Sequence, residues 1–155
     1  MHVLFATAEM EPLVSTGGLG AASAGLVAAL RRDGVRVTPV LPGYRPWELV
    51  DDRVLQLTVP AWAGPAVARI GTVPGLGEVA VIDAPSLPRP HPYVDPETGS
   101  GWRDNDHRFF AWSSAVAALA MALRPDVVHV NDWHAATTLA HLRPGPATVL
   151  SIHNL

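Results

Sequence analysis

Short continuous apolar runs alternate with longer segments of helical periodicity along this chain. The short runs are typical of strands that are buried on both faces of a sheet, and the periodic segments are typical of amphipathic helices. The predicted strands span residues 2–7, 35–41, 53–59, 66–73, 78–84, 126–130 and 147–153. The predicted helices span residues 21–34, 107–124 and 131–143.

The order of these elements predicts an α/β fold with a Rossmann-like, doubly wound and mostly parallel sheet. Short turns join the consecutive strands between residues 53 and 84, so we expect a small antiparallel excursion there. Residues 85–105 form a proline-rich loop without periodicity, and loops of this length are usually functional or disordered. Because no helix follows the last predicted strand, we expect residues 1–155 to form one truncated domain.

Polar residues and glycines follow several of the predicted strands. Open α/β sheets bind ligands beyond the carboxyl ends of their strands, so we expect residues from these separate segments to meet at one edge. The residues at the strand ends are Glu9, Ser15, Thr16, Gly17, Gly18, Gly20, Gly43, Tyr44, Asp83, Asn131, Asp132, Trp133, His134, His153 and Asn154. Their predicted convergence indicates a ligand-binding pocket.

The glycine loop, "VSTGGLG" at residues 14–20, lies between the first strand and the first helix. Gly17 and Gly18 allow the backbone to approach a ligand, and the helix N-terminus offers N–H groups to a phosphate or a sugar hydroxyl. A tight turn that needs glycine only for steric reasons explains the loop equally well. The spacing is not G-x-G-x-x-G, and no acid follows the second strand, so a nicotinamide or flavin cofactor is disfavoured.

Two polar residues beyond the strands are candidates for chemistry. Asp132 either caps the following helix or accepts a hydrogen bond from a sugar hydroxyl. His153 either bonds to the backbone or supports an oxygen that gains charge in a reaction. We expect His129 to be a core histidine and His134 to lie on the helix surface or against the loop. The spacing of these four residues matches no known zinc motif, so we expect no metal.

Composition excludes several classes of function. The net charge of −3 and the absence of a basic block argue against nucleic acid as a partner. The chain has no lysine and no cysteine, which excludes Schiff-base chemistry, disulfides and thiol nucleophiles. The longest apolar run, at residues 109–123, is interrupted by Ser113 and Ser114 and is too short for a membrane span. We therefore expect a cytoplasmic protein without a membrane segment.

Spaced segments of the sequence resemble the N-terminal catalytic domain of bacterial glycogen synthases and plant starch synthases, glycosyltransferase family 5. They read "HVLFATAEMEPLVSTGGLG", "VTPVLPGY", "DNDHRFFAWSSAV", "PDVVHVNDWHA" and "SIHNL". The resemblance implies the N-terminal half of a GT-B fold. It also implies retaining transfer of glucose from ADP-glucose to the non-reducing end of an α-1,4-glucan, without a metal or other cofactor. The partner domain would be a C-terminal GT-B domain, and the chain alone is expected to be inactive.

The resemblance also implies roles for individual residues. The catalytic residues would be His153 and Asp132, and the substrate-binding residues would be Ser15, Gly17, Gly18, Tyr93, Asn105 and Asn154. Ser15 stands where the family usually has a lysine that helps to bind the donor, and Ala21 replaces a usual aspartate. These departures leave two other hypotheses open: a non-catalytic half-domain that binds glucan or a partner, and a GT-B transferase that uses another sugar nucleotide.

Overall fold

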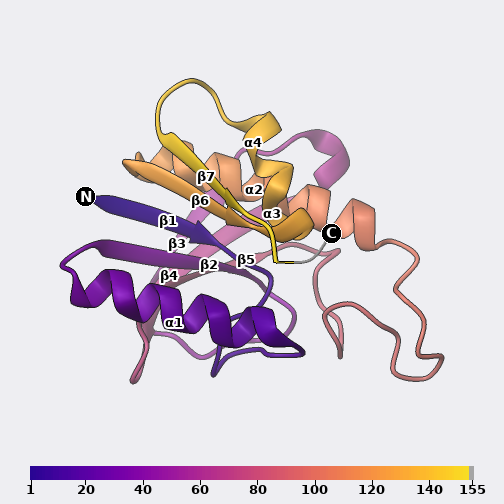
Figure 1. The fold of residues 1–155 in the computed structure, drawn as a ribbon. Coiled ribbons are helices and arrows are strands. Elements are labelled where there is room, and N and C mark those ends of the chain that lie inside the picture. Colours follow the sequence, from indigo (N-terminus) through magenta and orange to yellow (C-terminus); the bar gives the residue numbers. More distant parts are fainter. Residues whose placement is uncertain (154–155) are drawn as a thin grey trace.

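The computed structural model describes residues 1–153, and the strands in this range form one sheet with the order β3-β4-β5-β2-β1-β6-β7 (Figure 1). The strands are β1 (His2–Ala6), β2 (Arg36–Pro42), β3 (Val50–Leu57), β4 (Ala66–Val73), β5 (Gly77–Asp83), β6 (Val127–Asn131) and β7 (Ala147–Ser151). The helices are α1 (Gly18–Arg32), η1 (Ala61–Ala63, a 3-10 helix), α2 (Asn105–Leu123), α3 (Asp132–Ala136) and α4 (Thr138–His141).

The pairing of the strands confirms the predicted fold class. Parallel pairing joins β5 to β2, β2 to β1, β1 to β6 and β6 to β7. The β3–β4 and β4–β5 pairs are antiparallel, as their short connections predicted. The chain is therefore a doubly wound α/β domain in which one end of the sheet carries an antiparallel excursion.

Helices cover both faces of the sheet, which explains why its central strands are mostly apolar. On one face Phe5 of β1 packs in a cluster with Val27 of α1. On the other face Leu4 and Ala6 pack in a cluster with Trp112 of α2. Figure 1 shows α1 on one side of the sheet and α2, α3 and α4 on the other. No helix within residues 1–153 combines the length and apolar character needed to cross a membrane.

Most elements differ from their predicted bounds by one to three residues, and β3 starts at Val50 instead of residue 53. Two of these ends concern the candidate site. Helix α1 begins at Gly18, ahead of residue 21, and Gly17 is its extended N-cap residue. The N–H of Gly17 is bound by Glu9, a tertiary contact that a periodicity analysis does not contain. Strand β7 ends at Ser151, so His153 lies in the segment beyond the strand.

The predicted single helix over residues 131–143 is wrong, because the chain forms two short helices there. Helix α3 ends with Thr137 as its C-cap, and α4 begins at Thr138. Two adjacent β-branched residues restrict their side chains against the preceding turn, which lowers helix propensity at this point. The break turns α4 so that Thr138 is fully buried.

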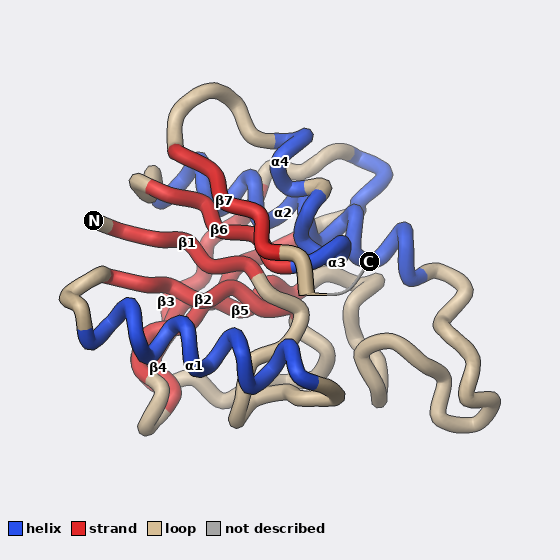
Figure 2. Tube along the Cα trace, viewed as in Figure 1, coloured by secondary structure: helices blue, strands red, loops and turns tan. Residues whose placement is uncertain are grey.

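The proline-rich loop is ordered by one buried cation. Arg108 of α2 is fully buried, and its guanidinium donates to the carbonyl oxygens of Ser86, Leu87 and Pro92, each at 3.1 Å. It also donates to Asn105 Oδ1 at 2.8 Å. Arginine suits this position because its planar fork carries several donors in fixed directions. The loop, drawn in tan between β5 and α2 in Figure 2, is thus held at its base by α2.

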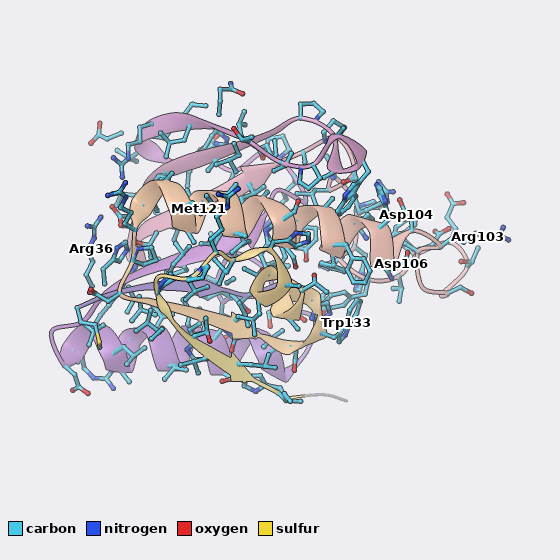
Figure 3. All side chains as sticks on the ribbon, turned by 90° about the horizontal axis from the view of Figure 1, so that it is seen from above. Arg36, Arg103, Asp104, Asp106, Met121 and Trp133 are labelled. Carbon is cyan, nitrogen blue, oxygen red and sulfur yellow. The ribbon has the colours of Figure 1, made fainter. Side chains whose placement is uncertain are left out.

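We predict that Arg108→Met lowers the free energy of unfolding by about 2–4 kcal/mol, because several buried carbonyl groups lose their donor. Urea unfolding of the chain measures this change. The control is Arg103→Met, since Arg103 is exposed and points away from the molecule (Figure 3). Equal stability of the two variants would contradict the proposed role of Arg108.

Candidate functional site

An open pocket of about 640 Å³, here called the edge pocket, lies at the carboxyl ends of the parallel strands. Its lining residues are Glu9, Thr16, Gly17, Gly18, Leu19, Tyr93, Asp132, Trp133, His134 and His153. They come from the segment after β1, the start of α1, the proline-rich loop, α3 and the segment after β7. The predicted meeting of the glycine loop, Asp132 and His153 at one edge is confirmed.

The carboxylate of Glu9 lies between the glycine loop and the proline-rich loop. Its Oε2 accepts hydrogen bonds from the N–H groups of Thr16 at 2.5 Å and Gly17 at 3.2 Å. Its Oε1 accepts a hydrogen bond from the Tyr93 hydroxyl at 2.6 Å. Glu9 is only 3% exposed, so these bonds are shielded from water. Burial raises the pKa of Tyr93, which therefore stays protonated as a donor.

The side chain of Asp132 is hydrogen bonded to the backbone of His153, and both residues line the edge pocket. The Oδ1 atom of Asp132 accepts from the His153 N–H at 2.6 Å. Asp132 is buried and has a φ of 57°, in the left-handed region that non-glycine residues rarely adopt. The N-cap of α3 is Asn131, and the helix has no side-chain cap hydrogen bond. Asp132 is thus the first residue of α3 and the acid of its first turn, with a backbone conformation that costs free energy.

An aromatic stack forms one wall of the edge pocket. The His134 ring lies between Trp133, with ring centres 4.0 Å apart, and Tyr93, with ring centres 4.8 Å apart. His134 is 7% exposed and Trp133 is 45% exposed. A surface position for His134 was expected as one alternative and is wrong, because the ring is buried against the proline-rich loop. Figure 3 shows Trp133 beside the N-terminal part of α2, where it also contacts Phe109.

Comparison with known proteins decides the family. Residues 2–155 match a family model described as the starch synthase catalytic domain. The chain belongs to this family. It is 38% identical to the glycogen synthase of Dechloromonas aromatica over 167 residues, a match that covers 100% of this chain and 34% of the relative. It is 40% identical over 170 residues to the glycogen synthase of Rhodopseudomonas palustris strain TIE-1, with 100% and 34% coverage.

A solved structure agrees with the family assignment. The chain is similar to the catalytic domain of Starch Synthase IV from Arabidopsis thaliana bound to ADP and acarbose, with a TM-score of 0.72 and 29% identity. The match covers 99% of this chain and 34% of that chain. This member of the starch synthase family thus spans about a third of the length of the relatives that it matches.

Ser15 does not line the edge pocket in this member of the family. Its Oγ donates to Glu11 Oε1 at 3.1 Å. A Cβ atom added at Gly20 would lie 2.7 Å from that Oγ, so the loop needs glycine at this position to fold against Ser15. Ser15 instead lines a smaller neighbouring pocket together with Arg45 and Arg89. The structure therefore separates Ser15 from Gly17, Gly18 and Tyr93, which line the edge pocket.

The other predicted residues occupy supporting positions. Asn105 does not line the edge pocket, and its Nδ2 donates to the carbonyl oxygen of Tyr93 at 2.8 Å. His129 is a core histidine, as predicted, and its Nε2 lies 2.8 Å from Ser151 Oγ. Asn154 lies outside the described residues. Within residues 1–153 no group of three or more acidic or histidine side chains is placed to hold a metal ion.

Glu9 is a pocket residue for which the sequence analysis assigned no individual role. A signal was present, because Glu9 follows an apolar strand at the edge where ligands bind. The hydrogen-bond partner of Glu9 could not be predicted from the sequence, because Tyr93 follows 84 positions later in a loop without periodicity. The described lining of the pocket contains the two acids Glu9 and Asp132 and no arginine. Carboxylates accept hydrogen bonds and hydroxyl groups donate them, so these two side chains favour sugar hydroxyls as ligands.

We predict that stability falls as the pH is lowered from 6.5 to 4, because burial lowers the pKa of His134 from 6.5 to about 4. In this range the unfolded chain binds a proton at this histidine and the folded chain does not, so the loss reaches about 3 kcal/mol. His134→Phe keeps a ring in the stack and removes the proton site. Its unfolding free energy should therefore depend less on pH in chemical denaturation.

The matched control for this measurement is His107→Phe, because His107 is exposed. It should keep the pH dependence of the parent chain. If His134→Phe also kept it, the buried ring would not be the group that titrates.

Proposed function

We propose that this chain forms the N-terminal wall of the catalytic cleft of an α-glucan synthase. The enzyme would transfer glucose from ADP-glucose to the non-reducing end of an α-1,4-glucan with retention of configuration, without a metal. The observation that carries the proposal is the convergence of the glycine loop, Asp132 and His153 on one pocket in a chain that matches the family over residues 2–155. The proposed setting is the cytoplasm, in keeping with the absence of cysteine.

The proposed roles follow from the chemistry of the lining. Asp132 would accept hydrogen bonds from hydroxyl groups of the transferred glucose, because an ionised carboxylate offers only acceptors. His153, whose backbone N–H donates to Asp132, would stabilise charge that develops on the glucosyl unit. Gly17 and Gly18 would lie beside the donor, since a Cβ atom at either would meet nothing within 4 Å and leaves open space there. Tyr93 would line the same cleft, and Asn105 would support it. Asn154 is proposed as a substrate contact from the resemblance alone.

A second domain is part of the proposal. No arginine lines the edge pocket among the described residues, so the cations that a diphosphate requires would come from that domain. The end of the sheet supports this view, because Val149 and Leu150 of β7 are 44% and 42% exposed and Ile152, just beyond the strand, is 59% exposed. Exposed apolar residues on an edge strand are a surface that further protein covers. We therefore propose that residues 1–155 are part of the N-terminal domain of a GT-B enzyme.

A non-catalytic glucan-binding half-domain is the second candidate. The position of Ser15 away from the edge pocket and the absence of a cation from its described lining favour it. The two candidates differ in whether the chain recognises a sugar nucleotide, and this difference can be measured directly.

We predict that ADP-glucose shifts the NMR signals of the residues that line the edge pocket. Asp132→Asn should weaken ADP-glucose binding about tenfold or more, because a charged hydrogen bond to the sugar is lost. Binding of ADP alone should change little, since Asp132 is proposed to contact the glucose. The control is Asp33→Asn, an exposed acid that caps the far end of α1.

The other outcomes of this titration separate the alternatives. Binding of maltotriose without any sugar nucleotide would support the half-domain. Preference for UDP-glucose or GDP-glucose would support another GT-B transferase. For transfer itself, we expect no glucose incorporation into glycogen by the chain alone. We expect incorporation when residues 1–155 replace the matching segment of the Dechloromonas aromatica relative, which then supplies the rest of the enzyme.

A further inference from the structure

Glu9 is a buried carboxylate without a cationic partner in the described part of the chain. Its charge is instead balanced by three donors, the N–H groups of Thr16 and Gly17 and the Tyr93 hydroxyl. This number of donors matches an ionised carboxylate, which can only accept hydrogen bonds. A buried charge held in this way is fixed in position, because moving it would leave both the charge and its donors unsatisfied.

The bonds of Glu9 leave only part of the glycine loop for a ligand. The N–H groups of Thr16 and Gly17 already donate to Glu9. The N–H groups of Gly18 and Leu19 lie in the first turn of α1 and therefore have no intrahelical acceptor, and within residues 1–153 they have no backbone acceptor outside the helix either. Both residues line the edge pocket. An anion in this pocket therefore finds free donors at Gly18 and Leu19 and a fixed negative charge beside Thr16.

Glu9 also joins two walls of the pocket that are far apart in the sequence. The backbone around Tyr93 is fixed by His91, whose Nδ1 accepts from the N–H groups of Tyr93 at 3.2 Å and Val94 at 3.1 Å. The ring of Tyr93 stacks on His134 of α3, with the ring centres 4.8 Å apart. Its hydroxyl then reaches Glu9, so this side chain links the proline-rich loop to the glycine loop.

We propose that Glu9 is the positioning residue of the edge pocket. Its carboxylate holds the glycine loop and Tyr93 together, and its charge directs a bound diphosphate to the N–H groups of Gly18 and Leu19. The sugar hydroxyls then bind on the side of the pocket that carries the carboxylates. The identification of the anion as the diphosphate of a sugar nucleotide rests on the proposed function, whereas the link between the loops does not.

The charge of Glu9 can be tested with inorganic pyrophosphate as the probe. Glu9→Gln keeps an acceptor of nearly the same shape and removes the charge, so pyrophosphate binding should tighten on the order of tenfold at low salt. Glu11→Gln is the matched control, because it removes the same charge two positions away. Glu11 is exposed and does not line the edge pocket.

The link between the loops can be tested by hydrogen exchange of the backbone amides, with no ligand present. Glu9→Ala removes both acceptor oxygens, so the amides of Thr16 and Gly17 should exchange at least about tenfold faster than in the parent chain. Tyr93→Phe removes only the hydroxyl and should loosen the proline-rich loop while the two amides stay protected. Glu11→Gln should change neither region. If Glu9→Ala fails to fold, Glu9→Gln takes its place, because its amide offers one acceptor oxygen where Glu9 offers two. In Glu9→Gln either the amides of Thr16 and Gly17 or the backbone around Tyr93 should then lose protection.

The results that would overturn the proposal differ from those that would overturn the function. Equal pyrophosphate binding by Glu9→Gln and Glu11→Gln would show that the charge of Glu9 does not direct anions. Unchanged exchange at Thr16 and Gly17 in Glu9→Ala would show that the link is absent. If both tests succeed and the parent chain still binds no ADP-glucose, the positioning role stands and the proposed function fails.

Discussion

The parallel pairing of β1 with both β2 and β6 is the constraint on which the site depends. Ala6, the last residue of β1, lies opposite Val40 of β2 and Val130 of β6. The residues that follow β1 and β6 therefore leave the sheet at the same level, which brings Glu9 and Asp132 to one pocket. The side chain of Asn131 secures this arrangement, because its Nδ2 donates to the carbonyl oxygen of Ala6 at 3.1 Å.

The chemistry of the edge pocket follows from its charges. Two buried carboxylates and a histidine whose pKa is held at about 4 make a wall that is acidic and rich in acceptors at neutral pH. Such a wall suits the hydroxyl groups of a sugar, whereas a diphosphate finds its donors at the start of α1 and needs further cations. A cleft closed by a second domain reconciles these two demands, as the proposed function requires.

The proline-rich loop contributes to this pocket although it has no regular structure. Arg108 fixes its base against α2, and Asn105 and His91 fix the backbone around Tyr93. Tyr93 can therefore stack on His134 and reach Glu9 with little loss of conformational entropy on ligand binding. The order of this loop depends on buried polar groups, which explains how a segment with few apolar residues packs at all.

The sequence by itself determined the fold class and the edge at which the site residues meet, because buried parallel strands form nearly continuous apolar runs and their carboxyl ends share one side of the sheet. It could not determine the break between α3 and α4, the position of Ser15 or the partners of Glu9. The break and the position of Ser15 depend on local packing, such as the bond between Ser15 and Glu11, whereas the bond between Tyr93 and Glu9 joins residues 84 positions apart. Local periodicity carries no information about such contacts, and only the tertiary structure brings the donors to the carboxylate.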